Sequence, residues 1–191
     1  MKKHIVFDVD DTLTNSYEVN QQLFVDTFKE YKDKIDEQYI RDLHYRNRGV
    51  GMLQQFSEVV EYFKLDVKPE ILMEENEKMH IEAVVKFNKM KVFAYTKELL
   101  ELIKSKGKKI SACTNRQYGS QKAIFEANDL FKYFDNIISC KDEGHEKPDP
   151  YCLLDLVEKE GGNKDEFIYV GDSKTDRDFA ENAGVDYIII D

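Results

Sequence analysis

Five short runs of β-branched and aromatic residues constrain the fold of this chain more than any other feature. They span residues 5–8, 109–114, 136–140, 167–171 and 187–191. Apolar residues are nearly continuous within each run, which is typical of strands buried on both faces. Helical patterns lie between the later runs, at 96–106 and from Asp149-Pro150 to Gly161-Gly162. Strands that alternate with helices predict an α/β fold with a doubly wound parallel sheet.

The segment between about Tyr17 and Met90 interrupts this alternation, because it shows only helical periodicity. We therefore predict an all-α domain at residues 16–89, inserted into an α/β core formed by residues 1–15 and 90–191. The linkers at 13–16 and 89–95 are the expected hinges between them. The expected helix faces are Phe24, Phe28, Tyr31 and Ile35; Leu53, Phe56, Val60 and Phe63; and, after Pro69, Leu72, Met79, Ala83, Phe87 and Met90.

The composition limits the kinds of partner that this chain can have. Its formal net charge of −10 argues against nucleic acid and against an anionic membrane surface. The N-terminus leads into only a short apolar run, so we expect neither a signal peptide nor a membrane span. The cysteines Cys113, Cys140 and Cys152 match no metal-ligand spacing. A reduced, cytoplasmic setting is expected, with the protein as a monomer or a homodimer.

Polar residues follow four of the predicted strands. Ligands of open parallel sheets collect outside the carboxyl ends of the strands, so these groups are expected to converge. Asp8 and Asp10 are separated by one residue and share a face if the chain stays extended. The other groups are Thr114-Asn115, Lys147 in the loop after the third run, and Asp172 with Asp176 after the fourth run.

This set of groups suits phosphoryl transfer. Carboxylates from two strand ends form an oxygen-rich site for a hard cation, with Mg²⁺ preferred. The cation and Lys147 would allow a carboxylate to attack a phosphate and form an aspartyl-phosphate. Thr114, Asn115 and backbone N–H groups would bind the phosphoryl oxygens.

The motifs "DVDDT", "ACTN", "KP" and "GDSKTD", in this order, resemble the four motifs of the haloacid dehalogenase superfamily of phosphohydrolases. The resemblance covers nearly the whole chain and implies a Rossmann-like core. The helical insert resembles the cap of the phosphoglycolate phosphatase-like and β-phosphoglucomutase-like members.

The resemblance also implies a role for each motif residue. Asp8 would be the nucleophile and Asp10 the general acid and base. Thr114 would bind the phosphoryl group, and Lys147 would stabilise the nucleophile and the transferring charge. Asp172 would complete a Mg²⁺ site with Asp8 and the Asp10 carbonyl, while Asp176 would act in or just behind that ligand set.

The sequence leaves open which residues of the insert contact the substrate and which reaction the site performs. Arg46, Arg48 and Gly49, in "HYRNRGVGMLQQF", are the expected cap residues that contact a small phosphorylated metabolite. Asp11 is expected to cap a turn rather than to act in catalysis. A phosphatase is favoured over a haloacid dehalogenase because an alkoxide leaving group needs the acid at Asp10. A phosphomutase and a non-catalytic phosphate-sensing protein are the alternatives.

Overall fold

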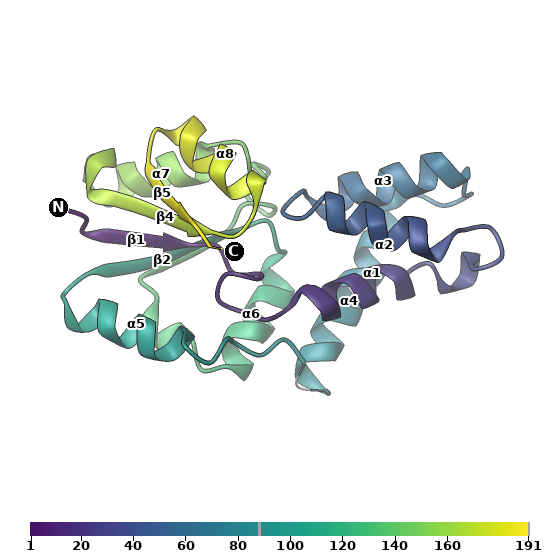
Figure 1. Ribbon diagram of the computed structural model, residues 1–191, viewed down its shortest axis with the longest axis horizontal. Coiled ribbons are helices and arrows are strands. Elements are labelled where there is room, and N and C mark those ends of the chain that lie inside the picture. Colours follow the sequence, from purple (N-terminus) through teal and green to yellow (C-terminus); the bar gives the residue numbers. More distant parts are fainter. Residues whose placement is uncertain (88, 191) are drawn as a thin grey trace.

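The computed structural model describes residues 1–87 and 89–190 and shows an elongated molecule with two lobes (Figure 1). One lobe contains a five-stranded parallel sheet with the strand order β3-β2-β1-β4-β5. Its strands are β1 (His4–Phe7), β2 (Lys109–Thr114), β3 (Asn136–Ser139), β4 (Phe167–Gly171) and β5 (Asp186–Ile189). The predicted α/β parallel sheet is confirmed, with strand ends shifted by one or two residues. Asp191, the end of the fifth predicted run, lies outside the described residues.

Helices cover both faces of the sheet (Figure 1). On one face α5 (Thr96–Ser105) and α6 (Tyr118–Ala127) bury Leu100 and Phe125 against Phe7 of the central strand. On the other face α7 (Tyr151–Lys159) and α8 (Lys174–Ala183) bury Leu153 and Phe179 against Tyr169. Each central strand is therefore apolar on both sides, which explains the continuous apolar runs. The short 3₁₀ helices η2 (Phe131–Tyr133) and η3 (Lys164–Glu166) lie in connections between these elements.

The second lobe is the helical insert. It consists of α1 (Tyr17–Asp26), the 3₁₀ helix η1 (Lys29–Tyr31), α2 (Glu37–Arg46), α3 (Met52–Phe63) and α4 (Pro69–Val85). A separate hydrophobic cluster holds these elements together around Phe24, Phe28 and Phe56. The helical character predicted for this segment is confirmed. The ends of α1 and α4 also pack on the sheet lobe, through Leu23, Ala83 and Val84.

The predicted helix face from Phe24 to Ile35 is wrong as a single helix, because α1 ends at Asp26. The Thr27 hydroxyl donates to the Leu23 carbonyl at 2.8 Å, and the Asn76 amide of α4 donates to the same carbonyl at 3.2 Å. The Leu23 carbonyl still accepts the helical Thr27 N–H at 3.1 Å, but the Phe28 N–H bonds to Val25 O, three residues back, at 2.9 Å, and the chain tightens into 3₁₀ geometry. The four apolar residues still reach one cluster. The long helix after Pro69 likewise stops at Val85, before the predicted Phe87 and Met90.

The two linkers between the lobes lie side by side. Asn15 N–H donates to Lys91 O at 2.9 Å, and Phe93 N–H donates to Leu13 O at 3.1 Å. Thr14 and Val92 form an isolated antiparallel bridge. The insert is thus attached to the sheet lobe through two hydrogen-bonded linker segments.

No helix in the described part of the chain is long and apolar enough to cross a membrane.

Candidate active site

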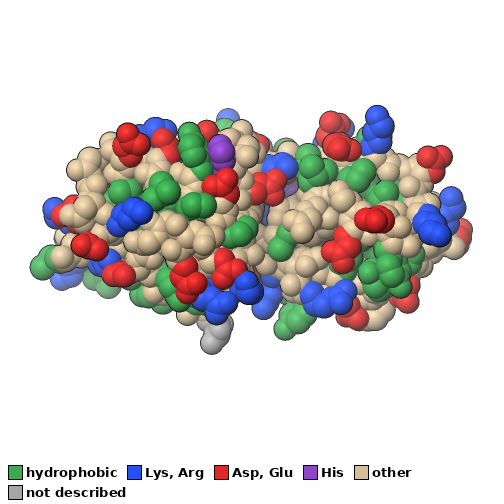
Figure 2. All heavy atoms as spheres, turned by 90° about the horizontal axis from the view of Figure 1, so that it is seen from above, with side chains coloured by type: hydrophobic (Ala, Val, Ile, Leu, Met, Phe, Trp, Pro, Cys, Tyr) green, Lys and Arg blue, Asp and Glu red, His purple; other side chains and the backbone are tan. Residues whose placement is uncertain are grey.

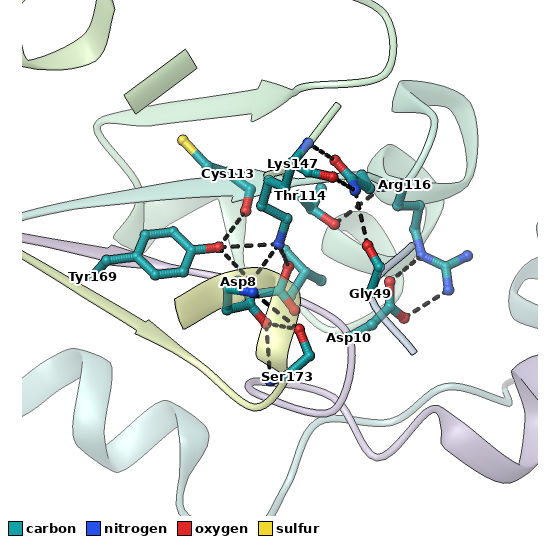
Figure 3. Close-up of polar contacts among 12 residues, drawn as sticks. Asp8, Asp10, Gly49, Cys113, Thr114, Arg116, Lys147, Tyr169 and Ser173 are labelled. Atoms are coloured by element: carbon teal, nitrogen blue, oxygen red, sulfur yellow. Dashed lines mark hydrogen bonds and ion pairs between the residues drawn. The ribbon is translucent and has the colours of Figure 1, made fainter. Parts of the chain in front are cut away.

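Lys147 joins the carboxyl ends of β1 and β4 at the centre of the site (Figure 3). Its side chain is 2% exposed. Its ammonium donates to Asp8 Oδ1 at 2.8 Å, to Asp176 Oδ1 at 2.6 Å and to the Tyr169 hydroxyl at 3.0 Å. These contacts use all three N–H groups of the ammonium. Strand order places Asp8 and Asp176 together, since β1 and β4 are neighbours where the connections diverge to opposite faces.

The electrostatics of this cluster follow from burying several carboxylates beside one ammonium. Burial raises the pKa of Asp8 well above its usual value, against the attraction of Lys147. Burial and the neighbouring Asp176 and Asp11 carboxylates raise the pKa of Asp172 to about 7. Lys147 outweighs burial at Asp176 and lowers that pKa. Two carboxyl groups are thus held above their ordinary pKa, which is the condition that a bound cation relieves.

Three of the predicted metal ligands do meet. Asp8, Asp172 and Asp176 each offer a carboxylate oxygen within 4.8 Å of the others. Oxygen donors of this kind fit a hard divalent cation. Both Asp176 oxygens are already in use, because Oδ1 accepts from Lys147 and Tyr169 while Oδ2 accepts from Ser173 N–H and its hydroxyl. This favours a place for Asp176 behind the ligand set rather than in it.

Thr114 and Asn115 lie at the end of β2, beside this cluster. The Thr114 hydroxyl accepts the Arg116 N–H at 3.2 Å, which leaves its own proton to donate. Asn115 differs from the prediction, because its amide donates to Gly49 O at 2.9 Å and to Lys147 O at 3.0 Å. Its Oδ1 accepts the Lys147 N–H at 2.7 Å. The Asn115 side chain therefore ties three loops together instead of presenting free donors to a phosphate.

Asp10 is engaged on the other side of the site, where Figure 3 shows it facing Arg116. Arg116 donates from Nε to Asp10 Oδ2 at 2.8 Å and from Nη2 to Oδ1 at 2.6 Å. Burial would raise the pKa of Asp10, but Arg116 and hydrogen bonds from Asn20 and Ser16 hold it well below its usual value. Arg116 was not among the predicted residues, although its place directly after Thr114-Asn115 was a signal that could have found it.

Asp11 behaves as expected. Its φ is +57°, and its carboxylate accepts the N–H groups of Ser16 and Tyr17 at 3.1 and 2.7 Å. It therefore caps the turn that leads from β1 into α1.

The turn between α2 and α3 brings the insert onto the core. Gly49 has φ +78°, and a Cβ there would lie 2.6 Å from Ser173 Oγ. A Cβ on Gly51 would overlap the Glu146 carboxylate. Only glycine allows so close an approach of the backbone. The predicted cap turn thus does lie over the site, and Arg48 lines the cavity there. Arg46 does not join it, since it is exposed and borders a shallow depression with Tyr39, Asp42 and Tyr45.

Two further residues of α4 line the cavity, and neither was predicted from the sequence. The Glu77 carboxylate accepts the Ser120 N–H of α6 at 2.6 Å, and burial raises its pKa. Burial, with Arg116 nearby, lowers the pKa of His80 to about 3, so that this imidazole is neutral. Its Nε2 lies 3.1 Å from Asn20 Oδ1. Helix periodicity alone could not show which face of α4 meets α6.

One cavity of about 130 Å³ lies between the lobes and joins these groups. The core contributes the predicted aspartates and the predicted phosphate-binding residues to its lining, and the insert contributes mainly polar side chains. Outside the cavity, Figure 2 shows acidic and basic side chains interspersed over the visible face. The main cavity-lining residues are Asp8, Asp10, Asp11, Tyr17, Asn20, His44, Arg48, Gly49, Gln55, Asn76, Glu77, His80, Thr114, Asn115, Arg116, Lys141, Lys147 and Asp172.

Comparison with known proteins agrees with this geometry. The sequence pattern of the family described as haloacid dehalogenase-like hydrolase matches residues 5–190. The chain belongs to this family and is therefore an enzyme of the hydrolase class, as the four motifs predicted.

Its curated relatives include phosphatases. The phosphoglycolate phosphatase of Aquifex aeolicus is 29% identical over 181 residues, covering 94% of this chain and 80% of the relative. A phosphorylated carbohydrates phosphatase of Thermotoga maritima is 25% identical over 185 residues, covering 96% and 82%. Among solved structures, CbbY of Rhodobacter sphaeroides in complex with phosphate has a TM-score of 0.82 at 19% identity, covering 99% of this chain and 86% of that one. This last likeness concerns the fold alone.

Proposed function

We propose that this enzyme is a Mg²⁺-dependent phosphatase that hydrolyses a small phosphomonoester through an aspartyl-phosphate on Asp8. The observation that carries the proposal is the buried contact between Lys147 and Asp8, both of which line the cavity between the lobes. A carboxylate held beside an ammonium can approach a phosphate dianion with less repulsion. Relatives named as phosphatases support the reaction class.

In the first step Asp8 attacks phosphorus, and the bond from phosphorus to the ester oxygen breaks. The leaving oxygen takes a proton from the Asp10 carboxyl group and departs as an alcohol. In the second step Asp10 takes a proton from water, the water oxygen attacks phosphorus, and Asp8 is released with inorganic phosphate. The net reaction is ester plus water to alcohol plus phosphate.

The remaining groups bind and orient. The Thr114 hydroxyl and the backbone N–H groups after β1 would donate to the phosphoryl oxygens. Mg²⁺, held by Asp8, Asp172 and the Asp10 carbonyl, would neutralise charge on the nucleophile and the phosphoryl group. Asp176 would fix Lys147 and support this ligand set.

We further propose that residues 16–89 act as a cap domain on a core of residues 1–15 and 90–191. The hydrogen-bonded linkers at 13–16 and 89–95 would be its hinges. Closure over a substrate would exclude water from the reacting groups. The cap turn with Gly49 would seal the site beside Ser173.

Phosphate release from a panel of phosphomonoesters and pyrophosphate, with Mg²⁺ and with excess chelator, tests the proposal. The wild type should release phosphate only with the metal. Asp8→Asn keeps the shape of the side chain but removes the nucleophile, so it should be inactive and folded by circular dichroism. Wild-type turnover by Asp8→Asn would refute the nucleophile assignment. Isomerisation of β-glucose 1-phosphate without phosphate release would point to a phosphomutase instead.

A further inference from the structure

Four hydrogen bonds hold the Asp10 carboxylate. Its Oδ1 accepts from Ser16 Oγ at 2.8 Å, Asn20 Nδ2 at 3.1 Å and Arg116 Nη2 at 2.6 Å. Its Oδ2 accepts from Arg116 Nε at 2.8 Å. Two parallel bonds from one guanidinium to one carboxylate form the strongest and most directional ion pair that side chains make. To act on the leaving oxygen of an ester, Asp10 would have to give up part of this pair with Arg116.

Arg116 is also buried and hydrogen-bonded. Its side chain is 7% exposed, and Nη2 also donates to Asn20 Oδ1 at 2.8 Å. Leaving a buried guanidinium without an anionic partner strongly destabilises the folded protein. Asp10 can therefore move toward the nucleophile only if another anion takes its place on Arg116.

The cavity is lined by a second cation. Arg48 of the cap turn lines the cavity. Its guanidinium lies 4.9 Å from the ring centre of Tyr45 and 5.8 Å from that of Tyr17. Within residues 1–87 and 89–190, no carboxylate lies within ion-pair distance of Arg48. An anion that reaches Arg116 through the cavity would thus meet a further positive charge from the cap.

We propose that Arg116 is a specificity-determining residue, which exchanges Asp10 for an anionic group of the substrate other than the transferring phosphoryl group. This inference rests on the proposed function. The substrate is then a phosphomonoester with a carboxylate or second phosphate near the ester. Binding of that group and release of Asp10 are one event, so an ester without the second anion leaves Asp10 on Arg116 and is hydrolysed slowly.

Matched substrate pairs test the exchange, since the two members differ only in the second anion. Suitable pairs are phosphoglycolate with 2-hydroxyethyl phosphate, 3-phosphoglycerate with glycerol 3-phosphate, and glucose 1,6-bisphosphate with glucose 6-phosphate. For at least one pair the wild type should prefer the anionic member by about tenfold or more in kcat/KM. The preference should be present in kcat as well as in KM, because Asp10 acts on the chemical step.

Arg116→Met should lose the preference, bringing each pair to within about twofold. Arg116→Lys keeps the charge but not the two-point contact, so it should retain part of the preference. It also provides the test if Arg116→Met does not fold. Arg41→Met is the matched control, because Arg41 is a cap arginine paired with Glu37 outside the cavity, and it should keep the wild-type preference.

Three outcomes would overturn the inference while leaving the phosphatase intact. They are hydrolysis without preference in every pair, a preference that survives in Arg116→Met, and a preference confined to KM, which would make Arg116 a simple binding residue. Absence of phosphate release from every ester would instead refute the proposed function.

Discussion

The hydroxyl of Tyr169 offers a sharp test of how the buried cluster is held together. It lies between two charges, accepting from Lys147 Nζ at 3.0 Å and contacting Asp176 Oδ1 at 2.9 Å, and Cys113 O lies 3.1 Å away. The tyrosine side chain is fully buried, so water does not compete for these contacts. Tyr169→Phe removes the hydroxyl and leaves one ammonium N–H of Lys147 without an acceptor.

The cost can be estimated from these contacts. A hydrogen bond to a charged group contributes about 1.5–3 kcal/mol, and an unpaired buried donor costs a similar amount. The two effects describe the same lost contact, so we expect Tyr169→Phe to lower the free energy of unfolding by about 2–3 kcal/mol. For a domain of this size that corresponds to a fall in Tm of about 4–12 °C.

Urea denaturation followed by circular dichroism measures this difference. Tyr187→Phe is the matched control, because the Tyr187 hydroxyl donates to Glu181 at 2.7 Å on the surface, where Tyr187 is 37% exposed. It should change the free energy of unfolding by less than about 0.5 kcal/mol. The two variants should share the wild-type m-value. Equal stability of Tyr169→Phe and the wild type would refute the argument that Lys147 depends on a third acceptor.

Two further predictions concern the cap and the cation. Gly49→Ala should lower kcat/KM by about tenfold or more, because its Cβ would lie 2.6 Å from Ser173 Oγ and push the cap turn outward. The control is Gly107→Ala, which is also at positive φ but has nothing within 4 Å of the added Cβ, so it should only lower the free energy of unfolding by about 1 kcal/mol. Equal kcat/KM of the two variants would contradict closure of the cap turn over the site. Since the pKa of Asp172 is about 7 in the fold against 3.8 ordinarily, the metal-free fold binds more protons than the unfolded chain between these values, and its stability should fall as pH rises through them. Mg²⁺ should therefore raise Tm more at about pH 8 than at about pH 5, where the proton on Asp172 competes with the cation, and an equal rise at both would exclude Asp172 as a ligand.

The residues of the candidate site could be predicted because each lies at the end of a strand or in the loop that follows it. The apolar runs identified the strands, and parallel strands present their carboxyl ends at one edge. Asp8, Thr114, Lys147 and Asp172 accordingly line one cavity. The prediction that the Asn115 amide binds phosphoryl oxygens did not include its partners Gly49 and Lys147, because these belong to loops distant in sequence.

The helical insert was predictable in kind but less so in detail. Periodicity identified α1, α3 and α4 and much of the core, including Phe24, Phe28 and Phe56, but no helix face was predicted for α2 (Glu37–Arg46). It could not show that α1 ends at Asp26, where the Phe28 N–H bonds to Val25 O three residues back. Nor could it place Arg46 outside the cavity and Arg48 within it. Arg46 ends α2 and Arg48 lies in the turn that follows, and the path of this turn depends on its contacts with the core.

The sequence by itself determined the class of fold, the order of the motifs and the carboxylates available for phosphoryl transfer. It did so because strand burial and motif spacing are local properties of the chain. Only the tertiary structure decided what those groups face. It joined Lys147 to Asp8 across 139 positions and Arg116 to Asp10 across 106. Pairing of buried charges depends on which loops meet in space, and that is set by the packing of the two lobes.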